Sequence, residues 1–155
     1  MIKSLIDQIA GTISAEAKAD SYDREQALRL ATAVLMVDVA RADHVFDELE
    51  FERVLQLIET HFSLTPEQSA ELVNAAGAKA EEMVSVFEFT QTLHKHLDDE
   101  EKARIISLLW KVAYADGRLD KYENSLVLKI SDLLYVSRGL VMRMKHDAEQ
   151  RNGSP

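Results

Sequence analysis

Two stretches of this chain carry the same spacing of acidic residues, and the helices around them decide the fold. Residues 113–123 read AYADGRLDKYE, and residues 40–50 read ARADHVFDELE. In each stretch an Ala-containing segment leads to an acid, a second acid four positions on and a third three positions later. The matching acids lie 73 positions apart, the first set being Asp43, Asp47 and Glu50 and the second Asp116, Asp120 and Glu123. This match predicts a duplicated unit.

The segments around both stretches have the apolar spacing of helices. Apolar residues recur at intervals of three and four, and no convincing run alternates with period two. The helices predicted before the acidic stretches, over 23–42 and from Asp99 to Ala113, are apolar around most of their circumference. Helices of this kind belong in the middle of a fold. The sequence therefore predicts an all-α, duplicated multihelical bundle with two central buried helices.

The order of helix signals predicts one domain over residues 1–150. Repeat 1 spans about 23–97 and repeat 2 about 98–148, each with a buried helix, an acidic hairpin, an amphipathic helix and a capped short helix. Asp23 with Gln26 indicates a capping box, and Thr65 indicates an N-cap before Pro66. An apolar face between Ile2 and Ile13 predicts an N-terminal helix packed on the core. The tail 151–155 lacks apolar anchors and is predicted to be disordered.

Asp38 and Lys111 occupy equivalent places on the two central helices. If these helices pack together, the two side chains can meet as a partly buried ion pair. The alternative is that each side chain extends separately to water.

Composition excludes several functional classes. The net charge of -9 and pI of about 5.0 argue against nucleic acid, because phosphates favour a Lys/Arg surface. With no cysteine, thiolate zinc sites, disulfides and cysteine nucleophiles are all excluded. No apolar run is long enough to cross a bilayer, and the N-terminus does not resemble a signal peptide. We therefore expect a cytoplasmic protein without direct membrane insertion.

The acidic stretches have a structural interpretation. Asp47 and Asp120 precede amphipathic helices, where a carboxylate can cap free backbone N–H groups. Glu50 and Glu123 lie three positions on, where a side chain completes a capping box. Capping alone could therefore account for both Asp-x-x-Glu patterns.

Capping explains the first acid of each stretch less well. Asp43 and Asp116 close a buried helix, where the helix dipole disfavours negative charge by some tenths of a kcal/mol. Gly117 permits the left-handed turn that ends the second of these helices, and His44 takes its place in the first. Three carboxylates around a tight turn suit a hard divalent cation such as Ca²⁺ or Mg²⁺. The predicted ligands are Asp43, Asp47, Glu50, Asp116, Asp120 and Glu123.

At these residues the chain resembles the TerB-like family, named for a component of bacterial tellurite-resistance systems. The resemblance rests on the Ala-rich helix end followed by Asp-Gly-x-x-Asp-x-x-Glu, with His44 replacing Gly in the first copy. It covers about 23–145 and implies an all-α duplicated bundle. It also implies divalent-metal binding through the six hairpin acids and a place in stress-response complexes that include membrane-embedded partners.

No enzyme motif accompanies this pattern. Glu-x-x-His, His-Glu-x-x-His and glycine-rich phosphate loops are all absent from the sequence. We therefore expect a non-enzymatic module that binds a divalent metal and a protein partner. The alternative is a metal-free helical adaptor in which the acids only cap helices.

Overall fold

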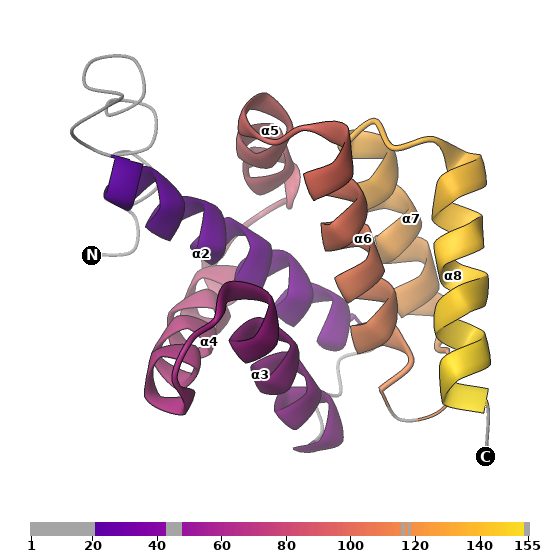
Figure 1. The fold of residues 1–155 in the computed structure, drawn as a ribbon, viewed down its shortest axis with the longest axis horizontal. Helices are drawn as coiled ribbons and strands as arrows, with labels where there is room; N and C mark the ends of the chain where they lie inside the picture. Colours follow the sequence, from indigo (N-terminus) through magenta and orange to yellow (C-terminus); the bar gives the residue numbers. More distant parts are fainter. Residues whose placement is uncertain (1–20, 43–47, 116, 118, 154–155) are drawn as a thin grey trace.

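The computed structural model describes residues 21–42, 48–115, 117 and 119–153, and these form seven helices without a strand. The predicted all-α fold is confirmed. Figure 1 shows the helices, whose bounds are α2 Ser21–Ala40, α3 Glu48–Phe62, α4 Pro66–Glu82, α5 Phe87–His96, α6 Asp99–Ala113, α7 Lys121–Leu133 and α8 Arg138–Gly153.

Helices α2 and α6 form the centre of the molecule. From Ala27 to Ala40, α2 has only three side chains that are not buried, because its sequence is apolar on nearly every face. Helix α6 buries a run that includes Leu109 and Trp110, both 0% exposed. The two helices pack against each other, as Figure 1 shows. The two predicted central helices are therefore both buried.

The remaining helices are arranged around this central pair. Helix α2 packs on α3 and α4, whereas α6 packs on α7 and α8. Helix α2 also contacts α7, and α6 also contacts α3. Helix α5 connects the two groups and packs on α2 and α7. This arrangement is the one expected of two stacked three-helix units, while their origin by duplication stays a prediction.

Local capping chemistry sets several helix starts. The Thr65 hydroxyl accepts a hydrogen bond from the Gln68 N–H at 3.1 Å, and the Gln68 side chain accepts one from the Thr65 N–H at 2.9 Å. Pro66 follows at the first helical position, so the predicted start of α4 is confirmed. Helix α2 begins at Ser21, two residues before the predicted Asp23. Helix α8 ends at Gly153, inside the predicted tail 151–155.

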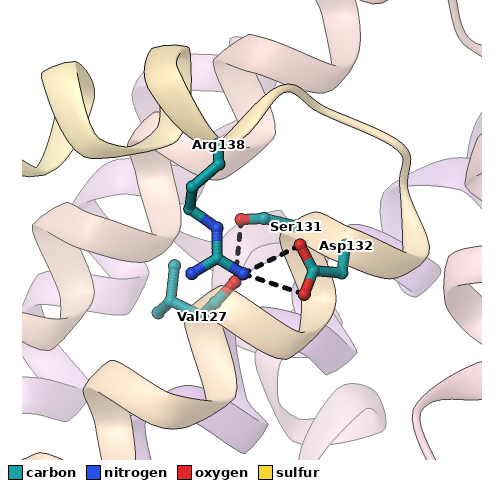
Figure 2. A network of polar contacts seen from close by, with 4 residues as sticks. All are labelled: Val127, Ser131, Asp132 and Arg138. Carbon is teal, nitrogen blue, oxygen red and sulfur yellow. Dashed lines mark hydrogen bonds and ion pairs between the residues drawn. The ribbon is translucent and has the colours of Figure 1, made fainter.

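Helices α7 and α8 are joined by polar contacts at their connection (Figure 2). Arg138 donates through Nη2 to both carboxylate oxygens of Asp132, at 3.0 and 2.9 Å. The Ser131 hydroxyl donates to the Val127 carbonyl at 2.8 Å within α7. Helices α6 and α8 are also joined by a polar contact, in which buried Trp110 donates through Nε1 to the Val141 carbonyl at 3.1 Å. This bond satisfies the polar atom of the largest core side chain.

Within the described ranges, no helix combines the length and apolar character that crossing a bilayer requires. The predicted N-terminal helix between Ile2 and Ile13 lies outside the described residues.

Candidate metal-binding hairpins

Two interhelical segments carry the predicted metal ligands, one between α2 and α3 and one between α6 and α7. Helix α2 closes with the Arg41 N–H donating to the Val37 carbonyl at 3.0 Å. Helix α6 closes with the Tyr114 N–H donating to the Trp110 carbonyl at 3.0 Å, and in the turn that follows the Gly117 N–H donates to the Tyr114 carbonyl at 2.9 Å. Gly117 has a φ of 93°, which is the left-handed turn predicted for it.

The structure describes three of the six predicted ligands. Glu50 lies in the first turn of α3, Asp120 is the N-cap of α7, and Glu123 lies in the first turn of α7. The other three predicted ligands lie outside the described residues, as does His44, and these three are Asp43, Asp47 and Asp116.

Asp120 performs the capping role that the sequence predicted. Its Oδ2 accepts hydrogen bonds from the backbone N–H groups of Tyr122 at 2.7 Å and Glu123 at 3.3 Å. These groups would otherwise lack partners at the start of α7. Both bonds use Oδ2, and within the described ranges no hydrogen bond to Oδ1 is found.

Glu50 and Glu123 are buried, each only 2% exposed. Capping does not require such burial. Glu101 completes a capping box at the start of α6, accepting from the Asp98 N–H at 2.9 Å, and yet its side chain is exposed. Removing a carboxylate from water costs free energy that a water-exposed cap avoids. The two hairpin glutamates therefore sit in a different environment from an ordinary capping glutamate.

The chemistry of these three side chains fits a hard cation. Carboxylate oxygens are the ligands that Ca²⁺ and Mg²⁺ prefer. Within the described part of the chain, no group of three or more His, Asp or Glu side chains is close enough to hold a metal ion. Because each hairpin has at least one predicted ligand outside the described residues, the six-residue set stays a prediction.

Asp38 and Lys111 do not form the predicted ion pair. Burial raises the pKa of the Asp38 carboxyl, and the positive charges that act against this effect belong to Arg41 and Lys129. Burial lowers the pKa of Lys111, assisted by the like charges of Arg151 and Arg53. The two side chains thus face different neighbours. Equivalent positions in the two repeats therefore do not bring these two side chains together.

Beside the hairpins lies a groove that sequence reasoning missed. It has a volume of about 450 Å³ and is formed by the end of α2, the end of α4 and one face of α7. Its lining side chains are Asp38, Arg41, Ala42, Ala80, Tyr122, Ser125, Leu126 and Lys129. No sequence signal joins these residues, since more than 80 positions separate Arg41 from those on α7.

Comparison with known proteins agrees with the acidic pattern. The family model described as Tellurite resistance protein TerB matches residues 29–146, which is most of the chain. Neither the search of curated proteins nor the search of solved structures returns a match. The matched range runs from within α2 to within α8 and so includes both central helices and both hairpins. The chain therefore belongs to the TerB family.

Proposed function

We propose that this protein is a non-enzymatic TerB-like module that binds a divalent cation through its two acidic hairpins. It acts in the cytoplasm within a stress-response protein complex. The observation that supports this proposal most is the burial of Glu50 and Glu123 at matched places on α3 and α7. A buried carboxylate is retained where positive charge or hydrogen bonds compensate its lost hydration.

Each hairpin supplies a set of oxygen ligands in this proposal. In the second hairpin, Asp116, Asp120 and Glu123 hold the cation, with Asp120 contributing Oδ1 while Oδ2 keeps its capping bonds. In the first hairpin, Asp43, Asp47 and Glu50 have the same role. Ca²⁺ or Mg²⁺ bound there would neutralise the carboxylates and tie the end of one helix to the start of the next.

Isothermal titration calorimetry of the full chain with Ca²⁺, Mg²⁺, Mn²⁺ and Zn²⁺ tests metal binding. We expect heat of binding for the wild type at millimolar metal or below. Asp120→Asn and Glu123→Gln should weaken binding, because each removes a charged ligand oxygen. Asn is a good N-cap, so Asp120→Asn retains the start of α7 and isolates the ligand role.

Asp98→Asn is the matched control. Asp98 is an N-cap with a complete capping box, and it lies at the start of α6, away from either hairpin. Its replacement should leave the metal titration unchanged. Binding that survives Asp120→Asn/Glu123→Gln would place the cation elsewhere. If the chain binds none of the four metals, the alternative is a metal-free adaptor in which the acids only cap helices. The capping bonds of Asp120 favour that alternative.

The proposed complex includes a protein partner, with a membrane-embedded stress-response component as one member. Family membership supports this part of the proposal, and the absence of a spanning helix in the described ranges is compatible with a membrane component supplied by another chain. Affinity purification of the tagged full chain from membranes solubilised in mild detergent tests it. The proposal would be supported if one membrane protein is recovered reproducibly with the wild type and is lost with the hairpin variants.

A further inference from the structure

The groove between α2 and α7 is lined by both positively and negatively charged side chains. Asp38 and Arg41 come from the last turn and the end of α2, and Lys129 comes from the middle of α7. Among the described lining residues, two cations and one carboxylate give a net positive charge, whereas the chain as a whole carries -9. Local positive charge in an acidic protein favours a negatively charged ligand.

Within the described ranges, the two cationic side chains of this groove take part in none of the ion pairs. The ion pairs found among the described residues join Arg29 to Glu25, Arg104 to Glu100 and Arg138 to Asp132. Among those same residues, the side chains of Arg41 and Lys129 form no hydrogen bond or ion pair. Asp38 lies near both cations, which oppose the effect of burial on its pKa, but it is bonded to neither.

The remaining lining adds hydroxyl groups and a small apolar wall. Ser125 and Tyr122 present hydroxyls from α7, and Tyr122 is 54% exposed. Leu126 and Ala80 supply the apolar part. A guanidinium and an ammonium beside hydroxyl donors suit the oxygens of a carboxylate. The volume is large enough for an acidic side chain together with part of the backbone that carries it.

We propose that this groove binds an acidic segment of a partner protein, with Arg41 and Lys129 contacting a partner carboxylate. This inference rests on the proposed function in that the module acts by binding a protein, but it does not require the metal. Asp38 lines the groove together with the two cations and limits the affinity through repulsion. Tyr122 and Leu126 contact the neighbouring apolar part of the segment.

Nuclear magnetic resonance titration of the isotope-labelled full chain tests this proposal. The probe is the acetylated and amidated peptide Gly-Ser-Glu-Leu-Glu-Ser-Gly, and its counterpart with Gln for both Glu residues is the neutral reference. All titrations are carried out in EDTA, so that failure of the metal proposal does not affect the result. We expect the acidic peptide to shift backbone signals near Arg41, Ser125 and Lys129, and the neutral peptide to leave them in place.

Substitutions in the groove should change the affinity for the acidic peptide in opposite directions. Arg41→Gln and Lys129→Gln should each weaken binding of the acidic peptide about tenfold, the loss of one charge-assisted contact. Asp38→Asn should strengthen binding, since it removes the repulsive charge. Arg143→Gln is the matched control: this arginine is exposed on α8, does not line the groove, and should leave the affinity unchanged.

Several outcomes would overturn the proposal. Equal shifts with the acidic and neutral peptides would show that charge is not recognised. No shift with the acidic peptide at millimolar concentration would show that the groove does not take such a segment. Weaker binding by Asp38→Asn would contradict the assigned repulsion. Displacement of the peptide by a much lower concentration of inorganic phosphate would assign the groove to a phosphate-bearing ligand instead.

Discussion

Gly117 lies in the connection between α6 and α7, just after the C-cap residue Tyr114. Its φ of 93° is one that L side chains rarely adopt, while a Cβ added there would meet nothing within 4 Å. The need for glycine is therefore conformational and not steric. The Gly117 N–H donates to the Tyr114 carbonyl at 2.9 Å, which places this residue in the turn between α6 and α7.

Gly117→Ala should lower the free energy of unfolding by about 1 kcal/mol, because a left-handed residue with a Cβ is strained. Gly77→Ala is a control with the opposite sign. Gly77 lies inside α4, and an added Cβ there would also meet nothing within 4 Å. Alanine at that position should raise the free energy of unfolding by about 0.5–1 kcal/mol. Urea denaturation followed by circular dichroism measures both changes.

The free energy of unfolding should depend on pH because of His61. Burial lowers the pKa of its imidazole, and the charges of Arg104 and Lys111 lower it further. The unfolded chain then binds the proton more readily than the folded chain. The contribution of neutral His61 to stability is therefore fully present above the ordinary pKa of 6.5, and it decreases as pH falls toward the folded pKa. Urea denaturation at a series of pH values should show a decline in this range. His61→Gln should reduce the decline, and an unchanged pH profile would contradict the prediction.

At the level of the helices, N-terminal capping is the feature most relevant to the candidate site. Helices α4, α6 and α7 each begin with a side chain that accepts a hydrogen bond from the first turn: Thr65, Asp98 and Asp120. Exposed caps of this kind need only local sequence. The buried first-turn glutamates of α3 and α7 add a second requirement, since their environment depends on neighbouring elements.

Asp120→Ala should cost about 1 kcal/mol of stability, because the Tyr122 and Glu123 N–H groups lose their acceptor. Asp120→Asn should cost much less, since Asn caps nearly as well. Hydrogen exchange at the Tyr122 and Glu123 amides locates the effect: it should accelerate in the Ala variant and remain near wild type in the Asn variant. Equal acceleration in both would mean that the negative charge, and not the hydrogen bond, protects this turn.

The pair of central helices holds the whole molecule together. Each of them contacts helices of the other half, so loss of packing at one interface weakens both halves. Leu109 on α6 is 0% exposed and belongs to this common core, whereas Leu49 on α3 is 60% exposed.

Leu109→Ala should lower the free energy of unfolding by about 2–5 kcal/mol, because it removes buried methyl groups and leaves a cavity. Leu49→Ala removes the same atoms from an exposed position and should change stability by less than about 0.5 kcal/mol. Fluorescence of Trp110 and circular dichroism should report one shared transition for each variant. Separate transitions would show that the two halves unfold independently.

Much of the fold was predictable from particular residues. The apolar faces of α2 and α6 identified the two central helices, Thr65 and Pro66 identified the start of α4, and Gly117 identified its own turn. These features are local, since each depends on residues within a few positions. The capping half of the site was predictable for the same reason, because Asp120 needs only the next three residues of its own helix.

The relation between distant side chains was not predictable. Repeat symmetry paired Asp38 with Lys111, but the structure places Asp38 near Arg41 and Lys129 and Lys111 near Arg53 and Arg151. Equivalent positions in a repeat define a register along each helix, and they do not define the point at which two helices cross.

The sequence by itself determined that the chain is helical, where α4 and α7 begin, and which two helices lie at the centre. Helix propensity, capping and apolar periodicity act over a few residues and need no further information. Only the tertiary structure decided that Glu50 and Glu123 are buried while Glu101 is exposed, and that Arg41 and Lys129 face one groove. Burial and charge proximity depend on how whole helices pack, and that packing is set by the sum of many weak contacts across the chain.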